Sequence, residues 1–433
     1  MQKWKRCSIV CKNRRRRGLL YLQNCIGFKK RAPLFSPSPK LMFTMTTKFS
    51  NLFKAFFDSE KIAGLILVIC TLISLSIANS SFGGNYIHFI HQELDLSFLN
   101  TSMNYSIEHW VNDGLMAIFF LMVGLEVERE IYVGELADFK KAILPFAAAI
   151  GGICVPAFIH FILNRGTETQ AGFAIPMATD IAFALGILAL AGRKVPTSVK
   201  VFLTALAIID DIGAILVIAF FYTKTVFFIY LLVAGGILLG LFILNRLKVK
   251  KLIFYIIPGI FMWYCFLKSG VHATIAGVLL AFVIPFHNDD DENVSYHLQH
   301  FLHKPVAFII LPIFALVNTA IILPSNISAS LTSSNSLGII LGLAVGKLIG
   351  IFTVPFILVK TGFANLQEGI TWKNLIGIGL LGGIGFTMSM FISNLAYADV
   401  ELVSNSKLSI LVASTISAIT GLLVFMSNKK NTS

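Results

Sequence analysis

Two adjacent aspartates, Asp210 and Asp211, lie inside the apolar stretch ALAIIDDIGAILVIAFF at residues 205–221. If this stretch crosses a membrane, each charge at its centre costs about 2.5–3.5 kcal/mol on insertion scales. Asn or Leu would pack there without that cost. A structural ion pair or a helix cap is the alternative, but ionisable residues inside membrane spans usually serve function, and we interpret the pair as functional.

Neighbouring carboxylates can exchange protons for a metal cation at one site. Successive side chains on a helix point about 100° apart, so both can border the same cavity. Poor solvation and a like-charged neighbour favour the protonated form of a carboxylate. The ionised oxygens suit hard cations such as Na⁺ or Li⁺. We therefore expect Asp210 and Asp211 to hold either protons or a transient Na⁺ or Li⁺, so that protons from one side displace the cation toward the other.

A second charged position lies in IPMATDIAFALG, residues 175–186, which contains Pro176, Thr179 and Asp180. A proline, a threonine and a charge within one span predict a broken helix with exposed backbone ends. An ordinary proline kink is the alternative. Asp180 could meet the positive ends of broken helices.

Lys347 lies near the midpoint of the apolar stretch 337–359. The midpoint of a span is about 15 Å from either surface of a bilayer core. Snorkelling to the interface is therefore a poor alternative. We expect Lys347 to pair with a carboxylate or with the negative end of a broken helix.

The stretch GIGLLGGIGFTMSMF, residues 377–391, is dense in glycine. Close helix packing is one explanation, and an unwound middle is the one we prefer. The two interrupted spans are then the fourth and the eleventh, each the middle of a set of three helices. This order predicts an inverted repeat.

The composition indicates an all-helical integral membrane protein. Of 433 residues, 56% are hydrophobic and 13% are charged, with mean hydropathy +0.79, which leaves too little polar surface for a soluble protein of this size. Backbone groups in lipid must be paired internally, so apolar runs of this length predict helices. We predict about twelve spans, at 62–79, 109–127, 142–163, 171–191, 199–222, 226–245, 252–267, 271–286, 302–323, 337–359, 374–397 and 406–427.

The positive charge of the chain is confined to its beginning. Residues 1–61 contain 15 Lys and Arg against two acids, and the remaining residues balance, so the net charge of +13 gives no support to nucleic-acid binding. We divide the chain into a basic N-terminal extension, 1–54, and a membrane domain, 55–433. The extension is expected to be disordered or to precede the true start, near Met42 or Met45; an Arg-rich organelle transit peptide is the alternative.

Loop charges predict the orientation. Lys and Arg are enriched in cytoplasmic loops. Most of them fall on the side shared with the N-terminus, and the opposite side has only Arg165, Lys224, Lys268 and Lys407. Both termini are therefore predicted to be cytoplasmic. The opposite side also carries the long polar segment 80–106, whose alternating stretch YIHFIHQELDLSF suggests a small hairpin.

Other function classes have little support in the sequence. No HExxH zinc motif and no phosphate-binding loop is present, so we expect neither an enzyme nor a bound cofactor. A membrane hydrolase would need such a catalytic motif. A cation-coupled symporter of an organic anion would be compatible with similar architecture, and it remains the main alternative to cation/proton exchange.

Several long motifs resemble the NhaA-type Na⁺/H⁺ antiporters. They occur in the family's order: WVNDGLMAIFFLMVGLEVERE (110–130), ATDIAFALGILAL (178–190), ALAIIDDIGAILVIAFFYT (205–223), LKSGVHATIAGVLLAF (267–282), GLAVGKLIGI (342–351) and GIGFTMSMFI (383–392). The resemblance implies twelve helices in inverted repeats with two crossed, interrupted helices. It also implies electrogenic exchange of two inward H⁺ for one outward Na⁺ or Li⁺, regulated by pH, in a bacterial inner membrane. A homodimer formed through the outside hairpin is implied as well.

The same resemblance assigns roles to individual residues. Asp211 matches the essential ion-binding aspartate and Asp210 its neighbour. Thr179 and Asp180 match the helix crossing, and Lys347 matches a lysine that pairs with the first aspartate or balances the helix ends. Positions linked to the pH response are matched by Glu126, Glu130, His272, His300 and His303.

One departure concerns the pH response. The family usually has Glu immediately before the first of the two neighbouring histidines, whereas this chain has Gln299, and the loop at 289–292 is acidic where relatives are often basic. We therefore expect the pH response to be shifted or blunted.

Overall fold

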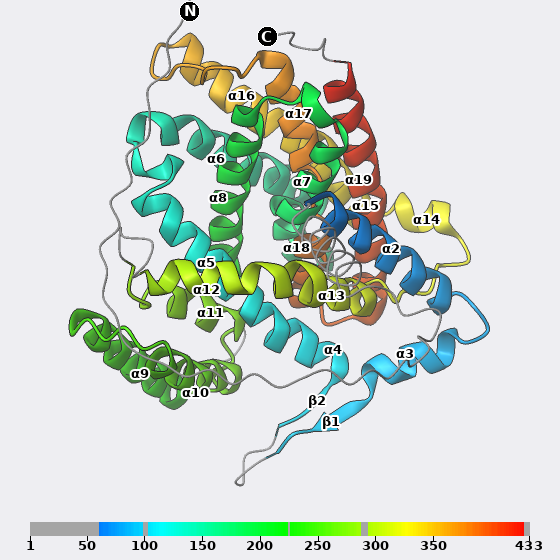
Figure 1. The fold of residues 1–433 in the computed structure, drawn as a ribbon. Coiled ribbons are helices and arrows are strands. Elements are labelled where there is room, and N and C mark those ends of the chain that lie inside the picture. The colour runs from blue at the N-terminus through cyan, green and yellow to red at the C-terminus, as the bar shows by residue number, and fades with distance from the viewer. Residues whose placement is uncertain (1–59, 98–102, 224–225, 287–292, 428–433) are drawn as a thin grey trace, which may run out of the picture. The chain divides into compact units, whose positions relative to one another are not determined.

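The computed structural model describes residues 60–97, 103–223, 226–286 and 293–427, all within one unit that covers residues 55–433. The predicted extension 1–54 and the acidic loop 289–292 lie outside this part of the chain. Among the described residues, the regular secondary structure is helical apart from one two-stranded hairpin (Figure 1).

Eight helices among the described residues are long and apolar enough to cross a membrane, or up to ten if each of two bent pairs is one span. The continuous ones are α2 (Glu60–Ala78), α4–η1–α5 (Ile107–His109, Trp110–Leu115, Met116–Tyr132), α6 (Phe139–Leu163), α8 (Thr197–Phe221), α9 (Phe228–Arg246), α12–η6–α13 (Val294–Pro305, Val306–Ile310, Leu311–Asn318), α15–η7–α16 (Ser334–Leu341, Gly342–Gly346, Lys347–Lys360) and α19 (Val400–Met426). Their runs of apolar residues confirm the all-helical membrane class.

The predicted count of twelve spans is not confirmed. The windows 252–267 and 271–286 correspond to α10 (Ile253–Ser269) and α11 (Thr274–Ala281), of 17 and 8 residues. Both are shorter than the roughly 20 residues of a typical span. Gly270, whose φ of 83° is left-handed, ends α10 and separates the two helices.

The two bent pairs fall where the sequence predicts interruptions. A short 3₁₀ segment, η3 (Glu168–Met177), meets α7 (Ile181–Leu190) at 48°, and α17 (Trp372–Gly382) meets α18 (Phe386–Ala396) at 44°. In the first pair, Pro176 lies just before the break and cannot donate a backbone hydrogen bond. In the second, a Cβ on Gly383 would lie 2.3 Å from the backbone oxygen of Leu343, so the close approach of α17 and η7 requires glycine.

A hairpin and short helices connect the long spans. The hairpin pairs β1 (Glu93–Asp95) with β2 (Asn104–Ser106), Leu94 opposite Tyr105, and projects from the helices in Figure 1. Residues 86–91, predicted as part of a strand, instead belong to the helix α3 (Gly83–His91), because local helical hydrogen bonding outweighs the alternating pattern there. The remaining elements are η2 (Glu135–Ala137), η4 (Gly192–Lys194) and α14 (Ile327–Leu331).

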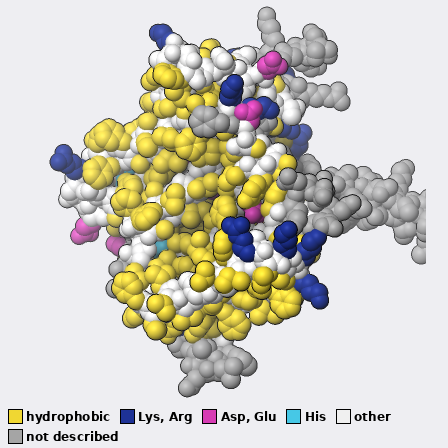
Figure 2. Space-filling view, turned by 90° about the vertical axis from the view of Figure 1, so that its left-hand side faces the viewer, with side chains coloured by type: hydrophobic (Ala, Val, Ile, Leu, Met, Phe, Trp, Pro, Cys, Tyr) yellow, Lys and Arg dark blue, Asp and Glu magenta, His cyan; other side chains and the backbone are white. Residues whose placement is uncertain are grey.

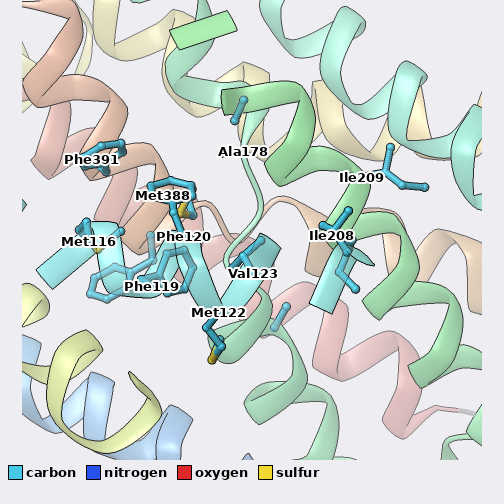
Figure 3. Packing of buried hydrophobic residues seen from close by; sticks show 14 of the residues in the cluster. Met116, Phe119, Phe120, Met122, Val123, Ala178, Ile208, Ile209, Met388 and Phe391 are labelled. Atoms are coloured by element: carbon cyan, nitrogen blue, oxygen red, sulfur yellow. The ribbon is translucent and has the colours of Figure 1, made fainter. Parts of the chain in front are cut away.

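Apolar side chains occupy both the interior and much of the surface. Phe120, Phe391, Met116 and Met388 are fully buried and lie side by side in Figure 3. Apolar side chains also cover most of the face shown in Figure 2. On α9, Phe228 remains 77% exposed. An exposed apolar surface of this kind is what lipid tails solvate.

Candidate functional site

Asp210 and Asp211 lie at the middle of α8 and are 0% and 1% exposed. α8 has 25 residues, so each of the two aspartates lies at least ten residues from either end of the helix. At this position neither carboxylate can reach bulk water by rotating its side chain. The charges must therefore be balanced within the protein or neutralised by bound cations or protons.

Lys347 supplies part of that balance. It begins α16 directly after the π-helical segment η7, and its fully buried ammonium donates to Asp210 Oδ2. A π turn inserts an extra residue into a helix and changes which face the following side chains occupy. The local irregularity at η7 thus helps to set the direction of Lys347, whose partner is the first aspartate of the pair.

Thr179 joins the site to the break between α17 and α18. Its hydroxyl lies 2.8 Å from Asp210 Oδ2 and 2.8 Å from the backbone oxygen of Gly382. One hydroxyl hydrogen is available for both acceptors. Thr179 is fully buried, and it connects the first interruption with the second at the aspartate.

Asp180 holds the two breaks together from the other side of Thr179. Its Oδ1 accepts from the backbone N–H of Phe183 at 2.9 Å, and so caps α7. Its Oδ2 accepts from the backbone N–H and the hydroxyl of Thr387 at 3.1 and 2.5 Å. The backbone N–H of Asp180 donates to Ile384 O at 2.7 Å. One carboxylate therefore serves the positive N-terminal ends of both α7 and α18.

Three carboxylate oxygens at the pair carry no such contacts. Within the described part of the chain, neither oxygen of Asp211 has a hydrogen-bond partner, and Asp210 Oδ1 also has none. Buried polar atoms are almost always paired. Carboxylate oxygens are the ligands that hard monovalent cations and protons take up, so these atoms provide acceptor capacity for either.

A cavity of about 430 Å³ reaches this region from the C-terminal half of α5. It brings together several of the residues for which the sequence predicts a pH response, with Asp180 and Thr387 at the helix breaks. Its polar lining consists of Glu126, Arg129, Asp180, Thr204, His300, His303, Lys304 and Thr387.

Two other candidates for the pH response lie elsewhere. Glu130 does not line this cavity, and its carboxylate pairs with Arg129 at 2.8 Å. His272 lies before α11, where its Nε2 is 3.3 Å from the backbone oxygen of Tyr222. The structure thus brings Glu126, His300 and His303 together and places His272 apart from them.

Two buried charges were not identified as candidates from the sequence. Glu128 in α5 is 5% exposed and accepts from Ser295 of α12 at 2.7 Å. Lys407, which the sequence places among the outside loop charges, is 5% exposed, because α19 begins already at Val400 and packs it inside. The three alternating acids at 126, 128 and 130 are the sequence signal that could have indicated Glu128. The burial of Lys407 could have been predicted only if the first residue of α19 had been known.

Comparison with known proteins gives the family. Residues 54–425 match the family described as Na⁺/H⁺ antiporter 1. The Na⁺/H⁺ antiporter NhaA of Flavobacterium psychrophilum is 56% identical over 385 residues, which are 89% of this chain and 98% of that protein. NhaA 1 of Flavobacterium johnsoniae is 54% identical over 89% of this chain and its own full length, and NhaA of Cytophaga hutchinsonii is 55% identical over 87% and 95%. The resemblance seen in the motifs is confirmed, and this multi-pass membrane protein belongs to the Na⁺/H⁺ antiporter 1 family.

Proposed function

We propose that this Na⁺/H⁺ antiporter exchanges two inward H⁺ for one outward Na⁺ or Li⁺ at Asp210 and Asp211, without a cofactor. The observation that carries the proposal is the set of three unpartnered carboxylate oxygens beside the Lys347–Asp210 pair. These oxygens offer a cation ligands of the kind it prefers, in a place where protons satisfy the same atoms.

The charges of the site account for the stoichiometry. With both carboxylates ionised and Lys347 protonated, the three groups carry one net negative charge. A bound Na⁺ makes them neutral, whereas two bound protons leave one net positive charge. Exchange of one state for the other moves one net charge across the membrane, so the transport is electrogenic.

The membrane arrangement is part of the proposal. We propose twelve spans, with α10 and α11 included as short ones and with the two bent pairs crossing each other at their breaks. The contacts of Thr179 with Gly382 and of Asp180 with Thr387 support that crossing. The distribution of Lys and Arg supports cytoplasmic termini in a bacterial inner membrane.

We further propose that pH acts on the 430 Å³ cavity. Glu126, His300 and His303 line it together with Asp180, so a change in their protonation changes the charge that a cation meets on its way to the pair. Glu130 acts through Arg129, and His272 acts from its separate position before α11. Gln299 beside His300 cannot titrate, so we propose that the pH response of this chain is shifted or blunted.

A homodimer formed through the hairpin completes the proposal. The strands β1 and β2 are three residues each, and Leu94 and Leu96 are 42% and 57% exposed. A second copy pairing at this edge would cover them and would satisfy the free edge of the sheet.

The Asp211→Asn variant tests the site. Asn keeps the shape but cannot take up a proton or neutralise a cation, so we expect Na⁺-induced pH change in everted vesicles to fall to the level of vesicles without the protein. Glu368→Gln, which removes an exposed acid far from the pair in sequence, is the control and should retain exchange. Exchange by Asp211→Asn at the rate of the unaltered protein would reject the assignment. Uptake of an organic anion with Na⁺, and little Na⁺/H⁺ exchange when Na⁺ is the sole solute, would favour the symporter.

A further inference from the structure

A second polar cavity, of about 380 Å³, lies at the opposite end of the α4–α5 span from the ion-site cavity. Asn112 lines the second cavity and Glu126 the first. These residues are separated by 14 positions, or about 21 Å at 1.5 Å per helical residue. The second cavity is lined by α3, β2, α4, η1, α13, the segment 320–322, α18 and α19. Its polar lining includes His91, Glu108, His109, Asn112, Asn394 and Lys407.

A buried ion pair forms one wall of this cavity. Lys407 Nζ lies 3.3 Å from Glu108 Oε1, and Glu108 Oε2 lies 3.3 Å from His91 Nε2. Lys407 is 5% exposed, whereas the Glu108 side chain is 23% exposed and faces the cavity. Glu108 therefore connects the last helix to the segment before α5, and a buried ammonium depends on such a partner.

A row of amides forms another part of the lining. Asn394 Nδ2 donates to Asn318 Oδ1 at 2.6 Å, and Asn318 Nδ2 donates to Asn112 Oδ1 at 2.9 Å. Asn112 and Asn394 border the cavity, while Asn318 is fully buried behind them. Amide oxygens, like carboxylates, are suitable ligands for hard cations.

The helix α18 connects this cavity to the ion site. Thr387, Phe391 and Asn394 follow one another at intervals of four and three residues, so they share a face of α18. Thr387 donates to Asp180 at one end of that face, and Asn394 borders the cavity at the other. Between them Phe391 packs against Phe120 with ring centroids 5.6 Å apart. Both residues are labelled in Figure 3. This face of α18 is therefore polar at both ends and aromatic in the middle.

We propose that Lys407, in this cavity at the outer end of the proposed ion path, is a tethered cation that competes with Na⁺ for Glu108. The inference rests on the proposed function and concerns the face opposite the ion-site cavity. The ammonium of Lys407 and a Na⁺ ion carry the same charge and need the same carboxylate. Because Lys407 is covalently part of the cavity wall, it always competes for Glu108 and Na⁺ binds there weakly. A Na⁺ ion released outward is therefore not retained in the cavity. The arrangement repeats, at the surface end of the path, the pairing of Lys347 with Asp210.

The test compares the two faces of the membrane. Na⁺/H⁺ exchange is measured in right-side-out and in everted vesicles, and the half-saturating Na⁺ concentration is determined for each face. In Lys407→Met the outer value should fall several-fold, on the order of tenfold at low ionic strength, because the ammonium that competes with Na⁺ for Glu108 in a confined cavity is removed. Glu108→Gln, which keeps the shape of the side chain, should raise the outer value. The inner value should stay unchanged in both.

Matched variants separate charge from structure. Lys407→Arg keeps the charge and should behave as the unaltered protein. Glu401→Gln removes an exposed acid of α19 that does not line the cavity, and should also change nothing. Adding Glu108→Gln to Lys407→Met should abolish the gain. Equal shifts on both faces, or no shift in Glu108→Gln, would overturn the inference while leaving the antiport intact. Absence of Na⁺/H⁺ exchange in the unaltered protein on either face would reject the proposed function itself.

Discussion

At the proposed ion site, an ion pair lies beside carboxylate oxygens that have no partner among the described residues. Lys347 satisfies one oxygen of Asp210, and the oxygens of Asp211 have no partner among the described groups. Removal of one member of a buried pair leaves the other charge uncompensated, which is more costly than removal of both. Binding of a cation or a proton by these oxygens would therefore change the electrostatic energy of the site substantially.

This balance predicts the effect of replacing the lysine. Lys347→Gln leaves Asp210 with the hydroxyl of Thr179 as its remaining partner, and we expect a loss of about 3–5 kcal/mol in stability near neutral pH. The loss should shrink as the pH is lowered, because a protonated Asp210 no longer requires a cation. Thermal unfolding in detergent across a pH series measures both effects.

A double variant provides the control for this prediction. Asp210→Asn together with Lys347→Gln removes both charges, and should recover most of the stability lost in the single variant. A double variant as unstable as Lys347→Gln alone would show that the lysine stabilises the fold through its packing rather than through its charge.

At the scale of helices, the breaks depend on close backbone approach. A Cβ at Gly383 would meet the backbone oxygen of Leu343 at 2.3 Å and the hydroxyl of Ser417 at 2.6 Å. Backbone atoms cannot rotate away, so α17 and η7 would have to separate. Since η7 immediately precedes Lys347, such a shift would move the ammonium relative to Asp210.

Gly383→Ala is therefore expected to lower both thermal stability and the rate of Na⁺/H⁺ exchange in vesicles. Gly235→Ala in α9 is the matched change, because no atom lies within 4 Å of the added Cβ there. An alanine in an open helical position should raise stability by up to about 1 kcal/mol and leave exchange unchanged. Similar behaviour of the two variants would contradict the packing argument.

The sequence predicts well those features that depend on local composition. Charges in apolar stretches indicated Asp210, Asp180 and Lys347, all three of which are buried. Pro176 and the glycines after residue 376 indicated both breaks. Features that depend on tertiary packing escaped prediction. The burial of Lys407 requires knowing that α19 starts at Val400, and the pairing of Glu128 requires knowing that α12 packs on α5. The short length of α11 likewise depends on the turn at Gly270, whose geometry cannot be predicted from hydropathy.

For the molecule as a whole, the proposed stoichiometry predicts a response to voltage. If two protons enter for each Na⁺ that leaves, each cycle moves one positive charge inward. An inside-negative potential, imposed on proteoliposomes with a K⁺ gradient and valinomycin, should therefore accelerate Na⁺ efflux through molecules oriented as in the cell. Collapsing the potential should remove the acceleration. Efflux that is insensitive to voltage would indicate one-for-one exchange.

The double role of Asp180 has a mechanical consequence. Its carboxylate is bonded to the first turns of α7 and α18 at once, and its backbone N–H to Ile384 between α17 and α18. Displacement of either half-span without the other would strand a buried anion in hydrocarbon. The helices α7 and α18 are thereby held together as one rigid unit. Any conformational change that opens the site to the other face of the membrane has to move both helices together.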